Sequence, residues 1–190
     1  MIKLAKANKS KYALLGVLSH KSGSGYDIKK FCDESIGYFW NENFGHIYPV
    51  LKKLEEENLI TKTTEENEGH PQKNIYSITQ KGKDELNQWL KLPIDKAPRR
   101  SEMLLKIFFS THIPAKDIIK RLEEVKNDCT NNLIALRNVE MLLKTDAYTK
   151  NNSKKDLALW TITVKCGIKN IQAEIEWCNE SIEILNSLDD

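Results

Sequence analysis

The most restrictive feature of the sequence is an apolar seam near its C-terminal end. Apolar side chains recur there at alternating steps of four and three residues, without interruption. The seam is formed by Val164, Ile168, Ile171, Ile175, Cys178, Ile182 and Leu185. This heptad spacing is typical of a long helix that buries one stripe against a neighbouring helix. It predicts a helix over residues 157–188.

A second long helix is predicted over residues 114–144, because apolar residues recur there at similar spacing. They are Ile118, Leu122, Val125, Cys129, Leu133 and Leu136. Two such seams have to be buried, either on each other or on another chain, and the C-terminal seam is long enough for both. We therefore expect a two-fold homodimer. Its expected interface consists of Val164, Ile168, Ile171, Ile175, Cys178 and Ile182.

The N-terminal half has a different pattern, in which short elements are broken by glycine and asparagine. Residues 91–98 hold two prolines and no helical periodicity, so we predict two domains, residues 1–92 and residues 99–190. The net charge is only +2, which excludes a protein held on DNA by bulk charge. The first eleven residues nevertheless carry four lysines and no acid. Such an arm suits contact with phosphates, and a solvated tail is the alternative.

Hydrophobic periodicity predicts three short helices in the N-terminal half, over residues 11–20, 26–35 and 43–58. Two β-rich segments, residues 59–64 and 74–79, predict a hairpin, and a further helix follows over residues 80–90. This order is typical of a winged helix-turn-helix domain, and any small α+β domain is the alternative. The predicted fold is mainly α with a small β-hairpin, with an N-terminal winged helix-turn-helix and a C-terminal helical dimerisation and effector domain.

Local signals refine these helices. Ser24 and Thr79 are the expected N-caps of the second and fourth helices. The apolar face of the second helix is expected to contain Tyr26, Ile28, Phe31 and Cys32. The stripe of the third is expected to contain Phe44, Ile47, Val50, Leu51 and Leu54. The last helix of this half is expected to turn Leu86, Trp89 and Leu90 inward.

Four sequence blocks resemble the PadR family of transcriptional regulators. They are YALLGVL at 12–18, GYDIKK at 25–30, FWNENFGHIYPVLKKLE at 39–55 and EGHPQKNIYSITQKG at 68–82. The blocks follow the family's order and spacing, and the last two are highly specific. Residues 104–110 and 167–180 resemble, more weakly, the C-terminal helical domain of the longer PadR subfamily. The resemblance implies a dimeric winged-helix regulator, and it implies that some members respond to phenolic or other aromatic compounds.

The third helix carries the candidate base-reading side chains. The apolar stripe of this helix is expected to face the core. The other faces of the helix then carry Asn43, His46, Tyr48 and Lys52. These residues are hydrogen-bonding or aromatic groups suited to base edges and phosphates in a major groove. For Tyr48 the alternative is partial burial against the second helix, and for Lys52 it is an ordinary solvated lysine.

Further candidate DNA contacts surround this helix. Lys9 and Lys11 belong to the N-terminal arm, and Tyr26 begins the second helix. In the wing, Gly69, His70 and Lys73 are placed to follow a phosphate ridge or the minor groove. Acidic residues in the same loop oppose contact by the stem, so the tip is expected to touch DNA. A generic solvated hairpin is the alternative.

A small aromatic effector has a candidate pocket in the helical half. Met103 and Phe108 lie in a short apolar segment after residues 99–100, and Trp160 and Trp177 lie on the last helix. Together they are expected to line an apolar cleft between the domain and its dimer mate. The alternative is that all four belong to the core.

Several classes of protein are excluded by the sequence. It contains no phosphate-binding glycine loop, nucleophile elbow or zinc-protease motif, so no enzyme is expected. Its four cysteines and four histidines are scattered, which predicts no metal site and no cofactor, and buried or half-buried thiols. No apolar run approaches the length of a membrane span, and the basic N-terminus lacks the features of a secretory signal. We expect a cytoplasmic protein that makes no membrane contact.

These observations predict a sequence-specific DNA-binding transcriptional regulator. It is expected to repress, to bind a double-stranded operator as a homodimer, and to be released by a small aromatic effector. Two alternatives are a winged-helix module used for protein contact and a thiol redox-responsive regulator that uses Cys32 or Cys129.

Overall fold

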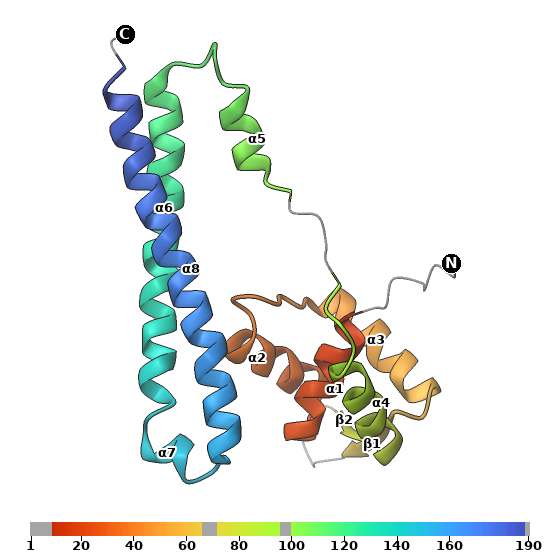
Figure 1. Cartoon of the computed structure of the whole chain (residues 1–190). Coiled ribbons are helices and arrows are strands. Elements are labelled where there is room, and N and C mark those ends of the chain that lie inside the picture. The colour runs from red at the N-terminus through yellow and green to blue at the C-terminus, as the bar shows by residue number, and fades with distance from the viewer. Residues whose placement is uncertain (1–8, 66–71, 96–99, 189–190) are drawn as a thin grey trace. The chain divides into compact units, whose positions relative to one another are not determined.

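The computed structural model describes residues 9–65, 72–95 and 100–188 (Figure 1). The chain divides into two compact units, residues 1–96 and residues 97–190, and each is described by itself. That residues 1–92 and 99–190 are independent domains stays a prediction.

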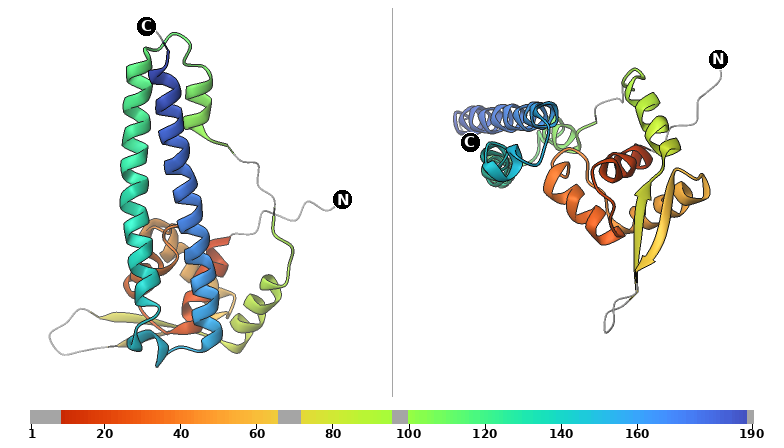
Figure 2. Two further views of the ribbon diagram at one scale, coloured as in Figure 1. Left: turned by 60° about the vertical axis from the view of Figure 1, so that its left-hand side comes forward. Right: turned by 90° about the horizontal axis from the view of Figure 1, so that it is seen from below.

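The first unit confirms the predicted winged helix-turn-helix order. Its elements are α1 (Lys9–His20), α2 (Gly25–Ser35), α3 (Phe44–Glu56), β1 (Ile60–Glu65), β2 (Lys73–Ile78) and α4 (Gln80–Leu90). The two strands are antiparallel, with Ile60 opposite Ile78 and Glu65 opposite Lys73 (Figure 2). Gly23, just before α2, adds a β-bridge to Tyr76 of β2. This bridge joins the helix-turn-helix to the hairpin.

Short polar side chains determine where these helices begin. Ser24 caps α2, and Asp27 completes a capping box by accepting a hydrogen bond from the Ser24 backbone. Thr79 caps α4 by accepting from the backbone N–H of Gly82 at 3.1 Å. Both predicted N-caps are therefore confirmed. Asn43 caps α3 in the same way.

The core of the first unit is built from one face of each element. Its buried apolar residues include Leu14, Leu15, Leu18, Ile28, Cys32, Ile47, Leu51, Leu54, Leu59, Ile60, Tyr76 and Leu86. Three residues that were expected to face inward are instead exposed. Tyr26 and Leu90 are each 63% exposed and Phe44 is 44% exposed. All three lie in the first or last turn of a helix, where a neighbouring element no longer covers them.

The second unit is entirely helical in its described part. It consists of α5 (Glu102–Phe108), α6 (Ala115–Leu142), α7 (Asp146–Thr149) and α8 (Lys154–Asn186). Helices α6 and α8 run side by side (Figures 1 and 2). The short helix α7 was not predicted. Among the described residues, no helix combines the length and apolarity needed to cross a bilayer.

Part of the C-terminal seam is buried inside its own chain. Val164 is 3% exposed and Cys178 is fully buried, and Cys178 packs with Ile118 and Leu122 of α6. Val164 and Cys178 are thus covered within their own chain, and their predicted contact with a partner chain stays a prediction. Ile182 also packs on this cluster. Ile168, Ile171 and Ile175 are only half-buried.

Candidate nucleic-acid interface

Helix α3 turns one face into the core and leaves the other in solvent. The buried side consists of Ile47, Val50, Leu51 and Leu54. His46, Tyr48 and Lys52 are exposed. Lys52 forms an exposed ion pair with Glu56 at 4.0 Å. Such pairs contribute little free energy, so a phosphate can compete for this ammonium.

Tyr48 is both exposed and packed against α2. Half of its side chain, 51%, is in solvent. Its ring lies over Gly25, where an added Cβ would be 2.7 Å from Cε1 of Tyr48. The Phe44 ring stacks beside it, with centroids 6.3 Å apart. The two interpretations of Tyr48 are therefore compatible, since one side of the ring is held by α2 while the remainder faces outward.

Two further candidates lie at the starts of helices. Tyr26, in the first turn of α2, is exposed. Asn43 is exposed as well, but its Oδ1 already accepts the backbone N–H of His46 at 3.0 Å. Only the amide nitrogen of Asn43 remains to donate to DNA.

The base of the wing is tied to the start of α2. Lys73 Nζ lies 2.9 Å from Oδ2 of Asp27. Hydrogen bonds from Ser24, followed by that from Lys73, lower the pKa of Asp27 to about 2. Asp27 is therefore a permanent anion that partly neutralises Lys73 in the free protein. Gly69 and His70, at the expected tip of the wing, lie outside the described residues.

The two arm lysines differ in their contacts. Lys9 forms an exposed ion pair with Asp95 at 3.5 Å. The ammonium of Lys11 lies between two carboxylates, 2.8 Å from Glu57 and 3.0 Å from Glu85. In the free protein the charge of Lys11 is used within the protein, which argues against the DNA contact predicted for it. The arm lysines before residue 9 lie outside the described residues.

The four predicted effector residues do not come together within the unit. Met103 and Trp177 pack against the cluster around Cys178, whereas Phe108 is 79% exposed. Trp160 lies on the same helix as Trp177 but about 26 Å away along its axis, at 1.5 Å per residue. A hollow of about 340 Å³ between α5 and α6 is lined by Met103 but by none of the other three residues.

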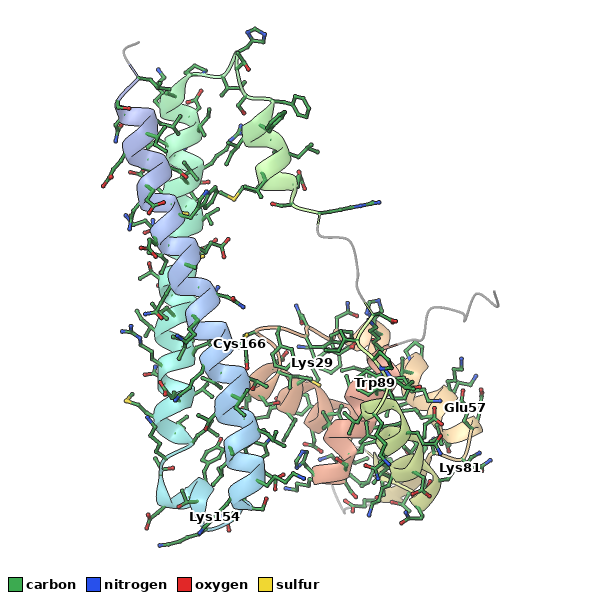
Figure 3. All side chains as sticks on the ribbon, in the orientation of Figure 1. Lys29, Glu57, Lys81, Trp89, Lys154 and Cys166 are labelled. Atoms are coloured by element: carbon green, nitrogen blue, oxygen red, sulfur yellow. The ribbon has the colours of Figure 1, made fainter. Side chains whose placement is uncertain are left out.

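A second hollow, of about 390 Å³, lies in the first unit and was not predicted. Its apolar lining comes from Tyr12, Ala13, Ile36, Phe39, Trp40, Trp89, Leu90, Leu92, Pro93 and Ile94. The rings of Tyr12 and Trp89 stack at 4.4 Å between centroids and form one wall (Trp89 is labelled in Figure 3). No signal in the sequence indicated this hollow, since Leu90 was expected to face the core.

The cysteines differ in accessibility. Cys32, Cys129 and Cys178 are buried, whereas Cys166 is exposed on α8 (Figure 3), which corrects its expected burial. Burial raises the pKa of Cys32 and of Cys129 to about 11. Both thiols are therefore protonated and unreactive near neutral pH. Across the part of the chain that the structure describes, no three metal-binding side chains gather.

The first unit has a three-helix core and a β-hairpin, and its third helix exposes hydrogen-bond donors and an aromatic ring. This arrangement defines the winged helix-turn-helix class. Residues 14–88 match the family described as transcriptional regulator PadR-like. Residues 99–186 match the domain described as virulence activator alpha C-term. The chain therefore carries a PadR-like transcriptional-regulator domain followed by a virulence activator alpha C-terminal domain.

Similar proteins include the negative transcriptional regulator PadR of Bacillus subtilis (strain 168). It is 41% identical over 101 residues, which are 52% of this chain and 55% of that protein, so the match spans about half of that relative. The structure of B. subtilis PadR with operator DNA has a TM-score of 0.78 at 26% identity, covering 94% of this chain and 99% of that chain. The structure with p-coumaric acid has a TM-score of 0.71 at 27% identity, covering 93% and 98%.

Proposed function

We propose that this regulator binds a specific double-stranded operator as a homodimer and represses transcription. The observation that carries the proposal is the solvent-facing side of α3, where His46 and Tyr48 are exposed above a packed core. An imidazole and a phenol on a helix of this kind suit base edges in the major groove. A similar protein, B. subtilis PadR, has been solved with operator DNA.

The proposed DNA contacts fall into two groups. His46, Tyr48 and the amide nitrogen of Asn43 read bases, and Tyr26 contacts the edge of the groove. Lys9, Lys52 and Lys73 contact phosphates, together with Gly69 and His70 at the wing tip. The exposed ion pairs of the three lysines are weak enough to exchange for phosphate.

Dimerisation is proposed for the helical unit because that unit leaves a large apolar surface in solvent. Leu104, Leu105, Phe108, Phe109, Ile134, Met141, Ile162 and Ile184 are each more than half exposed. The half-buried Ile168, Ile171, Ile175 and Ile182 remain part of the proposed interface. A two-fold dimer places two copies of α3 about 34–36 Å apart, or a multiple of that distance, to match two half-sites.

Sedimentation tests the dimer. The double change of Ile171→Lys and Ile175→Lys should give monomers, whereas Gln172→Lys, at an exposed neighbour, should leave the dimer intact. If the double variant stays dimeric, the interface lies on another face of the unit.

The effector is proposed to be a small aromatic molecule that releases the operator. Support comes from the two hollows, of which the one in the first unit has a mainly apolar lining, and from the p-coumaric acid complex of B. subtilis PadR. The repressor role is supported by the name of the B. subtilis relative, a negative regulator.

The base-reading role of α3 is tested with Tyr48→Ala. A duplex is first selected by the full chain from a random-sequence pool, and a scrambled duplex serves as the non-specific probe. Tyr48→Ala should weaken binding to the selected duplex by about 10-fold or more and leave the scrambled duplex unaffected. Tyr148→Ala, a partly exposed tyrosine on α7, should change neither. If no duplex is enriched, a protein-interaction module becomes the better interpretation.

A further inference from the structure

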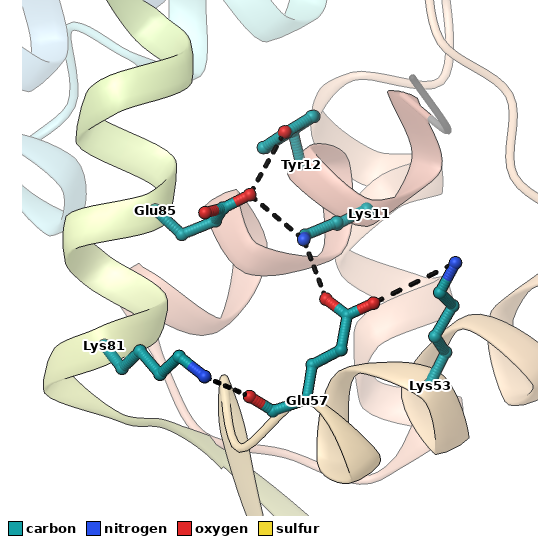
Figure 4. A network of polar contacts seen from close by, with 6 residues as sticks. All are labelled: Lys11, Tyr12, Lys53, Glu57, Lys81 and Glu85. Atoms are coloured by element: carbon teal, nitrogen blue, oxygen red, sulfur yellow. Dashed lines mark hydrogen bonds and ion pairs between the residues drawn. The ribbon is translucent and has the colours of Figure 1, made fainter. Parts of the chain in front are cut away.

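Helix α3 ends in an unusual electrostatic setting. Its C-cap is Glu57, although an acidic side chain at a helix C-terminus is disfavoured by the helix dipole. The same carboxylate also repels the phosphates that α3 is proposed to approach. Its position therefore needs a compensating contact. Figure 4 shows two, a long ion pair with Lys53 of α3 itself at 3.9 Å and a closer contact made from α1.

Lys11 supplies that contact and extends it to a third helix. Its ammonium donates to Glu57 at 2.8 Å and lies 3.0 Å from Glu85 of α4, which also accepts from the Tyr12 hydroxyl at 3.2 Å (Figure 4). The Lys11 side chain is only 20% exposed. Burial alone lowers the pKa of Lys11, but the hydrogen bonds with Glu57 and Glu85 outweigh it and raise the pKa above its ordinary value. The two carboxylates therefore hold the ammonium of Lys11 in its charged form.

The backbone at the end of α3 is held by the same group of elements. Lys81 Nζ of α4 donates to the carbonyl of Glu57 at 2.8 Å. The next residue, Asn58, has a φ of 57°, and its carbonyl accepts from the Thr79 hydroxyl at 2.9 Å. Carbonyls in a last helical turn lack partners within the helix, so these bonds determine how the turn is held. The C-terminal end of α3 is therefore attached to both α1 and α4.

We propose that Lys11 is a positioning residue for DNA recognition, which joins Glu57 to Glu85 and thereby sets the orientation in which α3 presents Tyr48. The inference rests on the proposed DNA-binding function. In this role Lys11 does not contact a phosphate. The carboxylates of Glu57 and Glu85 then promote the binding of DNA, although DNA is itself a polyanion.

The proposal is tested by neutralising one carboxylate and measuring whether DNA affinity rises or falls. Removing an acid near DNA normally strengthens binding to any duplex, because it reduces repulsion. Glu57→Gln and Glu85→Gln should instead weaken binding of the full chain to the selected duplex by about tenfold. The matched control is Glu56→Gln, an exposed neighbour of Glu57, which should bind as tightly as wild type or more tightly. All four proteins are titrated by fluorescence anisotropy well below their unfolding temperatures.

Variants of Lys11 separate positioning from phosphate contact. Lys11→Met should weaken specific binding by about tenfold without changing the slope of log affinity against log salt, and Lys11→Arg should restore affinity. A slope reduced by about 0.9 would mean that Lys11 contacts a phosphate, and would overturn the proposal. The proposal is also overturned if Glu57→Gln binds like Glu56→Gln. If the wild type itself does not prefer the selected duplex, the proposed function fails instead.

Discussion

The phenol ring of Tyr48 lies so close to the Cα of Gly25 that a Cβ at position 25 would be 2.7 Å from Cε1 and 2.9 Å from the hydroxyl oxygen. Two sequence blocks that resemble the PadR family thus meet at this contact. The capping box of Ser24 and Asp27 fixes the start of α2. Gly25 then supports one side of the ring and leaves the remainder exposed for recognition.

The contact predicts the effect of Gly25→Ala. The added methyl group meets the far end of a flexible side chain, so the ring moves and the fold survives. We expect specific DNA affinity to fall by about tenfold, as for the loss of one groove contact, while the unfolding temperature changes little. Gly16→Ala is the control, since nothing lies within 4 Å of its new Cβ. This variant should be more stable by about 0.5–1 kcal/mol and bind DNA normally. Unchanged affinity in Gly25→Ala would show that Tyr48 needs no such support.

Gly82→Ala is predicted to destabilise the first unit. An added Cβ would lie 2.1 Å from the carbonyl oxygen of Leu59, which belongs to the backbone and cannot swing aside. Overpacking of this kind costs about 2–3 kcal/mol. Thermal unfolding followed by circular dichroism measures the loss. A melting curve identical to that of the wild type would mean that α4 shifts freely against β1.

The elements of the first unit could be predicted because each carries a local signal. Ser24 and Thr79 mark helix starts, and the apolar spacing of α3 marks its buried face. Contacts between elements had no such signal. The ring of Tyr48 over Gly25 and the position of Lys11 between two acids depend on the packing of residues far apart in the sequence.

In the helical unit, spacing revealed the seam but could not identify its partner. A heptad pattern states that one stripe is buried, and it is the same whether the covering helix belongs to the same chain or another. The structure packs Cys178 against Ile118 and Leu122 of α6. The expected grouping of Trp160 with Trp177 does not occur within one chain, because the two residues lie about 26 Å apart along the axis of one helix.

The low pKa of Asp27 predicts a dependence of stability on pH. Its pKa is about 2 in the folded chain and 3.8 when unperturbed. A carboxyl with a depressed folded pKa stabilises the protein above pH 3.8, and this contribution is lost as the pH falls toward 2. Because the side chain is partly exposed, we expect Asp27→Asn to cost only about 1 kcal/mol at neutral pH. The free energies of unfolding of variant and wild type should converge near pH 2. A constant difference down to that pH would contradict the assignment.

Thiol accessibility predicts a single reactive cysteine. In the native protein Cys166 should react with a thiol reagent, whereas Cys32, Cys129 and Cys178 should react only after unfolding. The Cys166→Ser variant should show no fast phase, and reductant should leave operator affinity unchanged. Rapid labelling of Cys32 or Cys129 would revive the redox-responsive alternative.

The ratio of specific to non-specific affinity tests the central claim most directly. Full-length protein is titrated against its selected duplex and a scrambled duplex of equal length, at one fixed salt concentration. The account predicts that the selected duplex binds at least roughly 10³-fold more tightly, and that affinity for both falls steeply with salt, by about 0.9 in log slope for each phosphate contact. Equal affinity for the two duplexes would contradict sequence-specific recognition by α3.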